Sequence, residues 1–112
     1  MQYTKFYKQV ELLLRILPDV IQEDCFALKG GTAINMFVRD MPRLSVDIDL
    51  CYLPIEDRET TLTNIDRSLN EIAKKIQNRH ANIVIQKQSI SGEKTIRLNI
   101  NDSQTAIKIE TN

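Results

Sequence analysis

Residues 28–50 read LKGGTAINMFVRDMPRLSVDIDL, and this stretch says most about the fold. It leaves a short apolar run, passes through a Gly-Gly-Thr turn at positions 30–32 and ends with two aspartates one residue apart, Asp47 and Asp49. Apolar residues alternate with these aspartates, which predicts a half-buried β-strand. The segment therefore joins a glycine pair at one end to a carboxylate pair at the other.

The surrounding sequence predicts helices and a further strand. Phe26–Lys29 is a short apolar run that enters the glycine turn, as a strand would. Apolar residues at helical spacing predict a helix over Thr4–Leu17. Pro18 either ends this helix or starts a second short one. The same spacing predicts a helix over residues 33–38, ended by Met41-Pro42 because the residue before proline avoids the α region. The apolar positions of these two helices are Phe6, Val10, Leu13, Leu14 and Leu17, and Ala33, Ile34, Phe37 and Val38.

The chain after the aspartates predicts one long helix and three strands. Apolar residues from Leu62 to Ile76 recur at steps of three and four, which indicates a helix over about Glu56–Asn78. Alternating apolar and polar residues then indicate an antiparallel meander. Its strands are centred on Ile83–Ile85, Ile96–Ile100 and Ile107–Ile109. The whole order predicts an α+β domain with a mixed β-sheet and flanking helices.

The composition limits the class of protein. A chain of 112 residues fits one domain with a modest core, and 42% hydrophobic residues argue against disorder. Its formal net charge is zero, so nucleic-acid binding would need a local basic patch. No apolar run approaches the roughly 20 residues of a membrane span, and the N-terminus has no signal core. Cys25 and Cys51 lie far apart in the sequence and form no CxxC pattern, so we predict a cytoplasmic protein with reduced thiols. Cys51 is expected to be a small packed residue.

The aspartate pair suggests a cation site. Asp47 and Asp49 project from the same face of a strand, about 7 Å apart, and repel each other unless positive charge lies between them. Two hard cations about 3.5–4 Å apart, bridged by such oxygens, serve phosphoryl and nucleotidyl transfer. Glu110 shares the outward face of the last strand with Lys108 and would add a third carboxylate if that strand lay beside the first. A solvated strand face explains each feature taken alone.

The turn Lys29-Gly30-Gly31-Thr32 suggests a place for phosphate. A glycine pair between a strand and a helix lets backbone N–H groups approach an anion, and the helix N-terminus adds its dipole. Thr32 either caps that helix or donates its hydroxyl to the phosphate. A tight turn with a helix cap explains the same residues. Because the lysine precedes the glycines, this is not the phosphate loop of P-loop proteins.

These parts occur in a recognisable order. Their order matches the DNA polymerase β-like nucleotidyltransferase core. That core has a strand, GG(T/S), a helix, a strand with Dh[DE] and a later strand with h[DE], where h is an apolar residue. The segments LKGGTAINMF and RLSVDIDL, together with IKIE near the end of the chain, resemble the AbiEii/AbiGii toxin family of nucleotidyltransferases. The resemblance covers Phe26–Leu53 in detail and Ile107–Glu110 in part. Elsewhere it extends only to the order of elements.

The resemblance implies roles for individual residues. The turn at 30–32 would contact the β- and γ-phosphates of an NTP. Asp47 and Asp49 would hold two Mg²⁺ ions, one on the triphosphate and one shared with the acceptor hydroxyl. Glu110 would bind the acceptor-side ion and help make that hydroxyl a nucleophile. Pyrophosphate would leave and NMP would stay on the acceptor.

Four further residues have either a role in binding or an ordinary role on the surface. Arg43 and Ser45, in RLSVDIDL, either contact the triphosphate or a metal ligand, or are a solvated arginine and a loop hydroxyl. Lys29 and Lys108 either neutralise phosphate charge or pair with the aspartates.

The resemblance implies a Mg²⁺-dependent enzyme that moves NMP from an NTP to RNA or tRNA. It would be the toxin of a bacterial toxin–antitoxin or abortive-infection system, with a cognate antitoxin as partner. One alternative transfers AMP to a protein, as small nucleotidyltransferase antitoxins do. Others are a truncated, non-catalytic domain that binds nucleotide or antitoxin, and a structural domain with a coincidental motif. Family members are longer, so residues 1–112 are expected to be the core domain without a C-terminal helical region, which leaves independent activity open.

Overall fold

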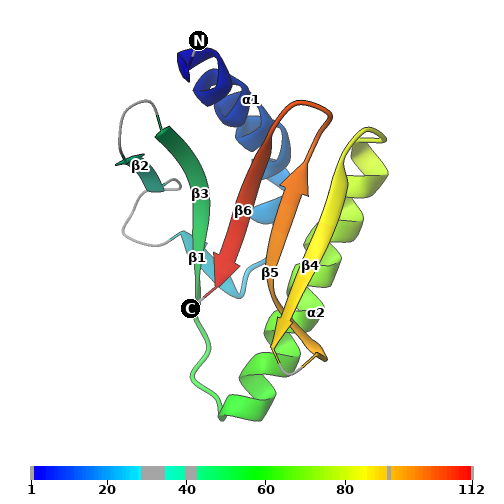
Figure 1. The fold of residues 1–112 in the computed structure, drawn as a ribbon. Coiled ribbons are helices and arrows are strands. Elements are labelled where there is room, and N and C mark those ends of the chain that lie inside the picture. The colour runs from blue at the N-terminus through cyan, green and yellow to red at the C-terminus, as the bar shows by residue number, and fades with distance from the viewer. Residues whose placement is uncertain (1, 29–34, 40–42, 91, 112) are drawn as a thin grey trace.

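The computed structural model describes residues 2–28, 35–39, 43–90 and 92–111, and Figure 1 shows their fold. It is an α+β domain with a mixed sheet, as predicted. The elements follow in the order α1 (Gln2–Val20), β1 (Phe26–Leu28), β2 (Asn35–Arg39), β3 (Arg43–Tyr52), α2 (Arg58–Arg79), β4 (Val84–Ile90), β5 (Lys94–Asn101) and β6 (Ala106–Thr111).

The sheet is organised around β3. Its six strands follow the order β1-β3-β6-β5-β4, and β2 pairs with β3 as well. β1 and β2 share one edge of β3, and β6 pairs with the other edge. The β3–β6 pair is parallel, and the other described pairs are antiparallel. The predicted meander of the last three strands is therefore confirmed.

Both helices cover the same face of the sheet, behind it in Figure 1. α1 packs against β3 and β6, and α2 packs against β5 and β4. The core consists of alternate positions of the strands and one stripe of each helix. Its most completely buried members include Leu12, Leu13, Ile16, Ile48, Leu50, Leu69, Ile72, Ile76, Leu98, Ile100 and Ile109. Neither helix of the described part of the chain has the length and apolar character that crossing a membrane requires.

The long helix α2 agrees with the prediction to within two residues at each end. Asp57 starts it, because one side-chain oxygen of Asp57 accepts a hydrogen bond of 2.7 Å from the backbone N–H of Thr60. Ile65, Leu69 and Ile72 recur at steps of three and four and are buried against the sheet. The apolar stripe thus fixes which side of α2 faces the strands.

The helix predicted over residues 33–38 is wrong for the part that the structure describes. Asn35–Arg39 forms β2, antiparallel to β3, with Asn35 opposite Asp47. Residues 33 and 34 lie outside the described residues. So short a helix is marginal, whereas pairing with the ten-residue β3 satisfies the backbone groups of this segment. Short apolar runs do not distinguish the two conformations by periodicity.

Smaller departures concern α1 and Cys51. α1 continues past Pro18, which stands in its last turn and lacks the N–H that would bond to the carbonyl of residue 14. Leu14 is 61% exposed and Leu12 is buried, so the buried stripe is rotated from the predicted one. Both cysteines are free, and Cys51 is exposed rather than packed, since it follows the buried Leu50 on a strand and faces the other side.

Replacing Ile72 by alanine tests the packing of α2 on the sheet. Ile72 is fully buried, so Ile72→Ala should lower the free energy of unfolding by about 2–5 kcal/mol in denaturant titrations. Its neighbour Glu71 is exposed, and Glu71→Ala should change that free energy by no more than about 0.5 kcal/mol. Equal small losses in the two variants would contradict this packing.

Candidate active site

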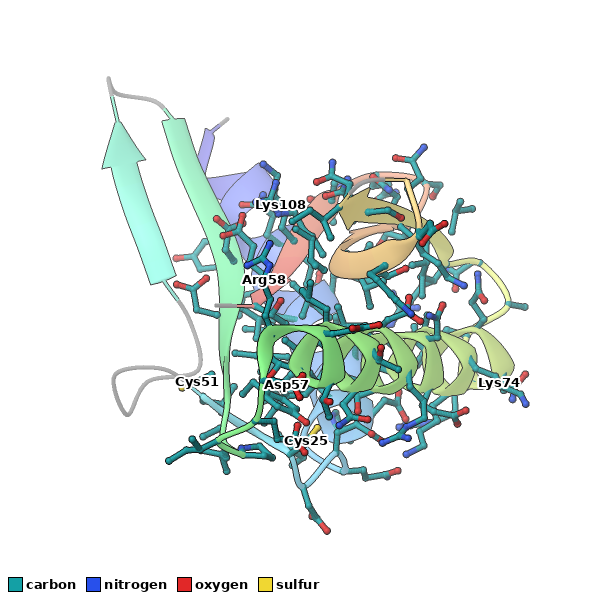
Figure 2. The ribbon with its side chains drawn as sticks, turned by 90° about the horizontal axis from the view of Figure 1, so that it is seen from below. Cys25, Cys51, Asp57, Arg58, Lys74 and Lys108 are labelled. Carbon is teal, nitrogen blue, oxygen red and sulfur yellow. The ribbon has the colours of Figure 1, made fainter. Side chains whose placement is uncertain are left out.

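The face of the sheet opposite the helices carries polar residues from β3, β5 and β6. Successive side chains of a strand point to opposite faces, so burial of Ile48, Leu98 and Ile109 turns their neighbours outward. Figure 2 shows Lys108 on the side of the sheet away from α2. The residues that share this open face are Asp47, Asp49 and Cys51 of β3, Arg97 and Asn99 of β5, and Lys108 and Glu110 of β6.

The parallel pairing of β3 with β6 places the three predicted carboxylates on adjacent strands. Asp47 lies opposite Lys108, and Asp49 lies opposite Glu110. Paired strands run about 4.8 Å apart, so Glu110 stands next to Asp49 on the same face. The prediction that the last strand would lie beside the aspartate strand is confirmed.

The pKa of Asp47 reflects both its burial and the negative charge around it. It is raised above the ordinary value of 3.8, first because burial disfavours the ionised form and next because Glu110 repels it. Asp49 raises it further, whereas the positive charges of Lys108 and Arg97 lower it. Asp47 pairs with β2 on one side and β6 on the other, which explains its partial burial.

Arg97 forms an ion pair with Glu110 across the β5–β6 pair. It lies opposite Glu110 in the β5–β6 pair, and its Nε is 3.5 Å from Glu110 Oε1. Its Nη1 donates a 3.0 Å hydrogen bond to Gln88 Oε1. Arg97 Nε and Asn99 Oδ1 are buried and have no hydrogen-bond partner among the described residues. The open face thus changes from acidic on β3 to basic on β5.

The donor set suits a hard divalent cation. Three carboxylates on adjacent strands supply the oxygen ligands that Mg²⁺ prefers, and their mutual repulsion is what a cation would relieve. In the described part of the chain, however, no three acidic, histidine or cysteine groups converge as a metal site. The carboxylate of Glu110 is directed to Arg97. The residues therefore fit the cation in chemistry and strand position, and their side chains are not yet gathered around one point.

The other predicted nucleotide contacts stay predictions. Four lie outside those residues: Lys29, Gly30, Gly31 and Thr32. Arg43 and Ser45 belong to β3, but their side chains are not described. The helix whose dipole was expected to help bind phosphate is replaced by β2 over residues 35–39. That part of the predicted phosphate site is wrong.

Arg97 and Asn99 are polar members of the open face that no sequence motif marks. Both belong to the run IRLNIN, where they alternate with buried Leu98 and Ile100. This alternation shows that they share a face. Their place beside Glu110 follows only from the pairing of β5 with β6.

An α+β domain whose mixed sheet exposes these carboxylates is compatible with a nucleotidyltransferase fold. A family profile described as nucleotidyl transferase AbiEii toxin, type IV toxin–antitoxin system, matches residues 11–112. The chain belongs to this family, as its motifs indicated. Nucleotidyltransferases of this kind generally use an NTP and a divalent metal. Searches of curated proteins and of solved structures gave no match.

The raised pKa of Asp47 predicts a pH-dependent gain in stability when its charge is removed. Ionising Asp47 costs the folded state more than the unfolded state, so its contribution to stability is highest below the ordinary value of 3.8 and falls as the pH rises through the raised pKa. In a metal-free buffer, Asp47→Asn should therefore raise the melting temperature at pH 7, and the gain should shrink as the pH approaches 4.

Asp24 provides the control, because it is exposed on the turn after α1. Asp24→Asn should leave the melting temperature nearly unchanged at both pH values. A lower melting temperature for Asp47→Asn at pH 7 would contradict the crowding of carboxylates.

Proposed function

We propose that this chain transfers NMP from an NTP to a hydroxyl group of RNA, with Mg²⁺ held by Asp47, Asp49 and Glu110. Membership of a nucleotidyltransferase toxin family supports the reaction class. The observation that carries the proposed site is the parallel register of β3 and β6, which sets Asp49 opposite Glu110 on an open face.

The three carboxylates would act as cation ligands on a rigid support. Asp47 and Asp49 would bind from β3, and Glu110 would complete the set from β6. The cations, when bound, neutralise phosphate charge and favour ionisation of the acceptor hydroxyl. A hydrogen-bonded sheet holds the ligands in place, so the contribution of the protein is mainly positioning and charge stabilisation. The acceptor oxygen bonds to the α-phosphorus, the bond to pyrophosphate breaks, and the hydroxyl proton passes to solvent.

Basic side chains beside the carboxylates would hold phosphate. Lys108 faces the open side next to Asp47, and Arg97 follows on the next strand. Ammonium and guanidinium groups bind phosphate oxygens through charge-assisted hydrogen bonds. The remaining proposed nucleotide contacts rest on the resemblance of their motifs: Lys29, Gly30, Gly31, Thr32, Arg43 and Ser45.

The family description also supports a biological setting. A toxin of a type IV system implies a cognate antitoxin. We propose that the toxin acts in the cytoplasm on RNA or tRNA, whose backbone phosphates would meet the basic part of the open face.

Removing the aspartates should abolish nucleotide binding that depends on Mg²⁺. Asp47→Asn/Asp49→Asn lacks two of the three proposed carboxylate ligands, so its affinity for Mg²⁺–NTP in calorimetry should fall at least about 100-fold. Glu71→Gln, on the exposed side of α2, should bind as the wild type does. Unchanged binding by the double variant would overturn the proposed site.

The acceptor can be identified by following label from an NTP labelled at the α-phosphate. We expect label in RNA when the chain is incubated with total RNA and Mg²⁺, and at least about a 100-fold lower rate for Glu110→Gln. Label in a protein would favour the AMP-transferring alternative. Binding of Mg²⁺–NTP without transfer to either acceptor would favour the non-catalytic alternative.

A further inference from the structure

Arg97 is held next to the carboxylates by its neighbours. Its Nη1 bonds to Gln88 at 3.0 Å, and its Nε lies 3.5 Å from the carboxylate of Glu110. The two side chains of this ion pair are 38% and 34% exposed, so solvent screens their attraction only in part. Gln88 therefore keeps the guanidinium on the side of Glu110 that faces away from β3.

Glu110 lies between two positions for positive charge. On β6 it is opposite Asp49 on one side and Arg97 on the other. Its carboxylate is directed to Arg97, and the carboxylates of the described residues do not converge as a metal site. A cation on the aspartates would attract Glu110 from the β3 side and would be repelled by the guanidinium. The cation and Arg97 thus compete for one carboxylate.

Arg97 is held to Glu110 by charge and not by a hydrogen bond. Its Nε is buried and makes no hydrogen bond to the described residues. A guanidinium presents its donors as a planar fork that matches phosphate oxygens. Since the aspartates and Arg97 flank Glu110 on one face, a phosphate attached to a cation on the aspartates would come within reach of that fork.

We propose that Arg97 is a positioning residue that exchanges Glu110 for a phosphate of the bound NTP. Without nucleotide, Arg97 holds Glu110 and weakens the binding of free divalent cation. With the triphosphate bound, the guanidinium turns to phosphate and Glu110 completes the cation site. This inference rests on the proposed function, because it requires a cation on Asp47 and Asp49.

The test compares free Mn²⁺ with the complex of Mn²⁺ and inorganic tripolyphosphate, both by calorimetry. Arg97→Gln should bind free Mn²⁺ about three- to tenfold more tightly than the wild type, because it removes a nearby positive charge and releases Glu110. It should bind the Mn²⁺–tripolyphosphate complex about three- to tenfold more weakly. Arg97→Lys keeps the charge without the fork and should weaken only the second binding.

The controls separate this inference from the proposed function. Arg67→Gln, an exposed charge on α2, should leave both affinities unchanged, and thermal unfolding in a chelator verifies that each variant is folded. If Arg97→Gln binds free Mn²⁺ no more tightly than the wild type, the inference is overturned. If Asp47→Asn/Asp49→Asn also abolishes Mn²⁺ binding, the proposed cation site stands even so. If the wild type binds neither free Mn²⁺ nor the Mn²⁺–tripolyphosphate complex, both fail. A last outcome concerns the source of the phosphate. If Arg97→Gln binds a short oligoribonucleotide more weakly but binds Mn²⁺–tripolyphosphate as the wild type does, Arg97 contacts a phosphate of the acceptor. The assignment of Arg97 to a phosphate of the NTP is then wrong.

Discussion

The parallel pairing of β3 with β6 is the contact on which the rest of the structure depends. On one face it buries Ile48 and Ile109 beneath the helices, and on the other it exposes Asp47, Asp49 and Glu110. A shift of either strand by one residue would exchange its two faces, so burial of the apolar side chains fixes the position of the carboxylates. The core therefore positions the candidate active site.

The arrangement that suits the chemistry of the site lowers the stability of the fold. Like charges on adjacent strands destabilise a sheet, and the pKa of Asp47 is raised first by burial and then by repulsion from Glu110 and Asp49. Lys108 and Arg97 relieve part of it, and burial of the core offsets the remainder. Local departures from stable design concentrate at functional sites, and here the departure coincides with the motif that places the chain in a nucleotidyltransferase family.

The sequence predicts those features that a local pattern determines. Long apolar periodicity gave α2, and alternation gave the strands of the meander and the shared face of the carboxylates. Residues 35–39 escaped prediction because pairing with β3, rather than local propensity, decides their conformation. Arg97 escaped for a related reason, since its contact with Glu110 requires the order of β5 and β6 in the sheet. The proposed phosphate turn at 30–32 lies outside the described residues and stays a prediction.

The most direct test of this account is to locate a bound cation on the open face. Mn²⁺ broadens the NMR signals of nuclei near it, so a titration of ¹⁵N-labelled protein maps where the ion binds. We expect the amides of residues 47–49 on β3 and 108–110 on β6 to broaden first, while those of α2 remain sharp. Broadening centred elsewhere, such as on Glu56 and Asp57 at the start of α2, or spread evenly over the surface, would contradict a cation site built by the β3–β6 pair.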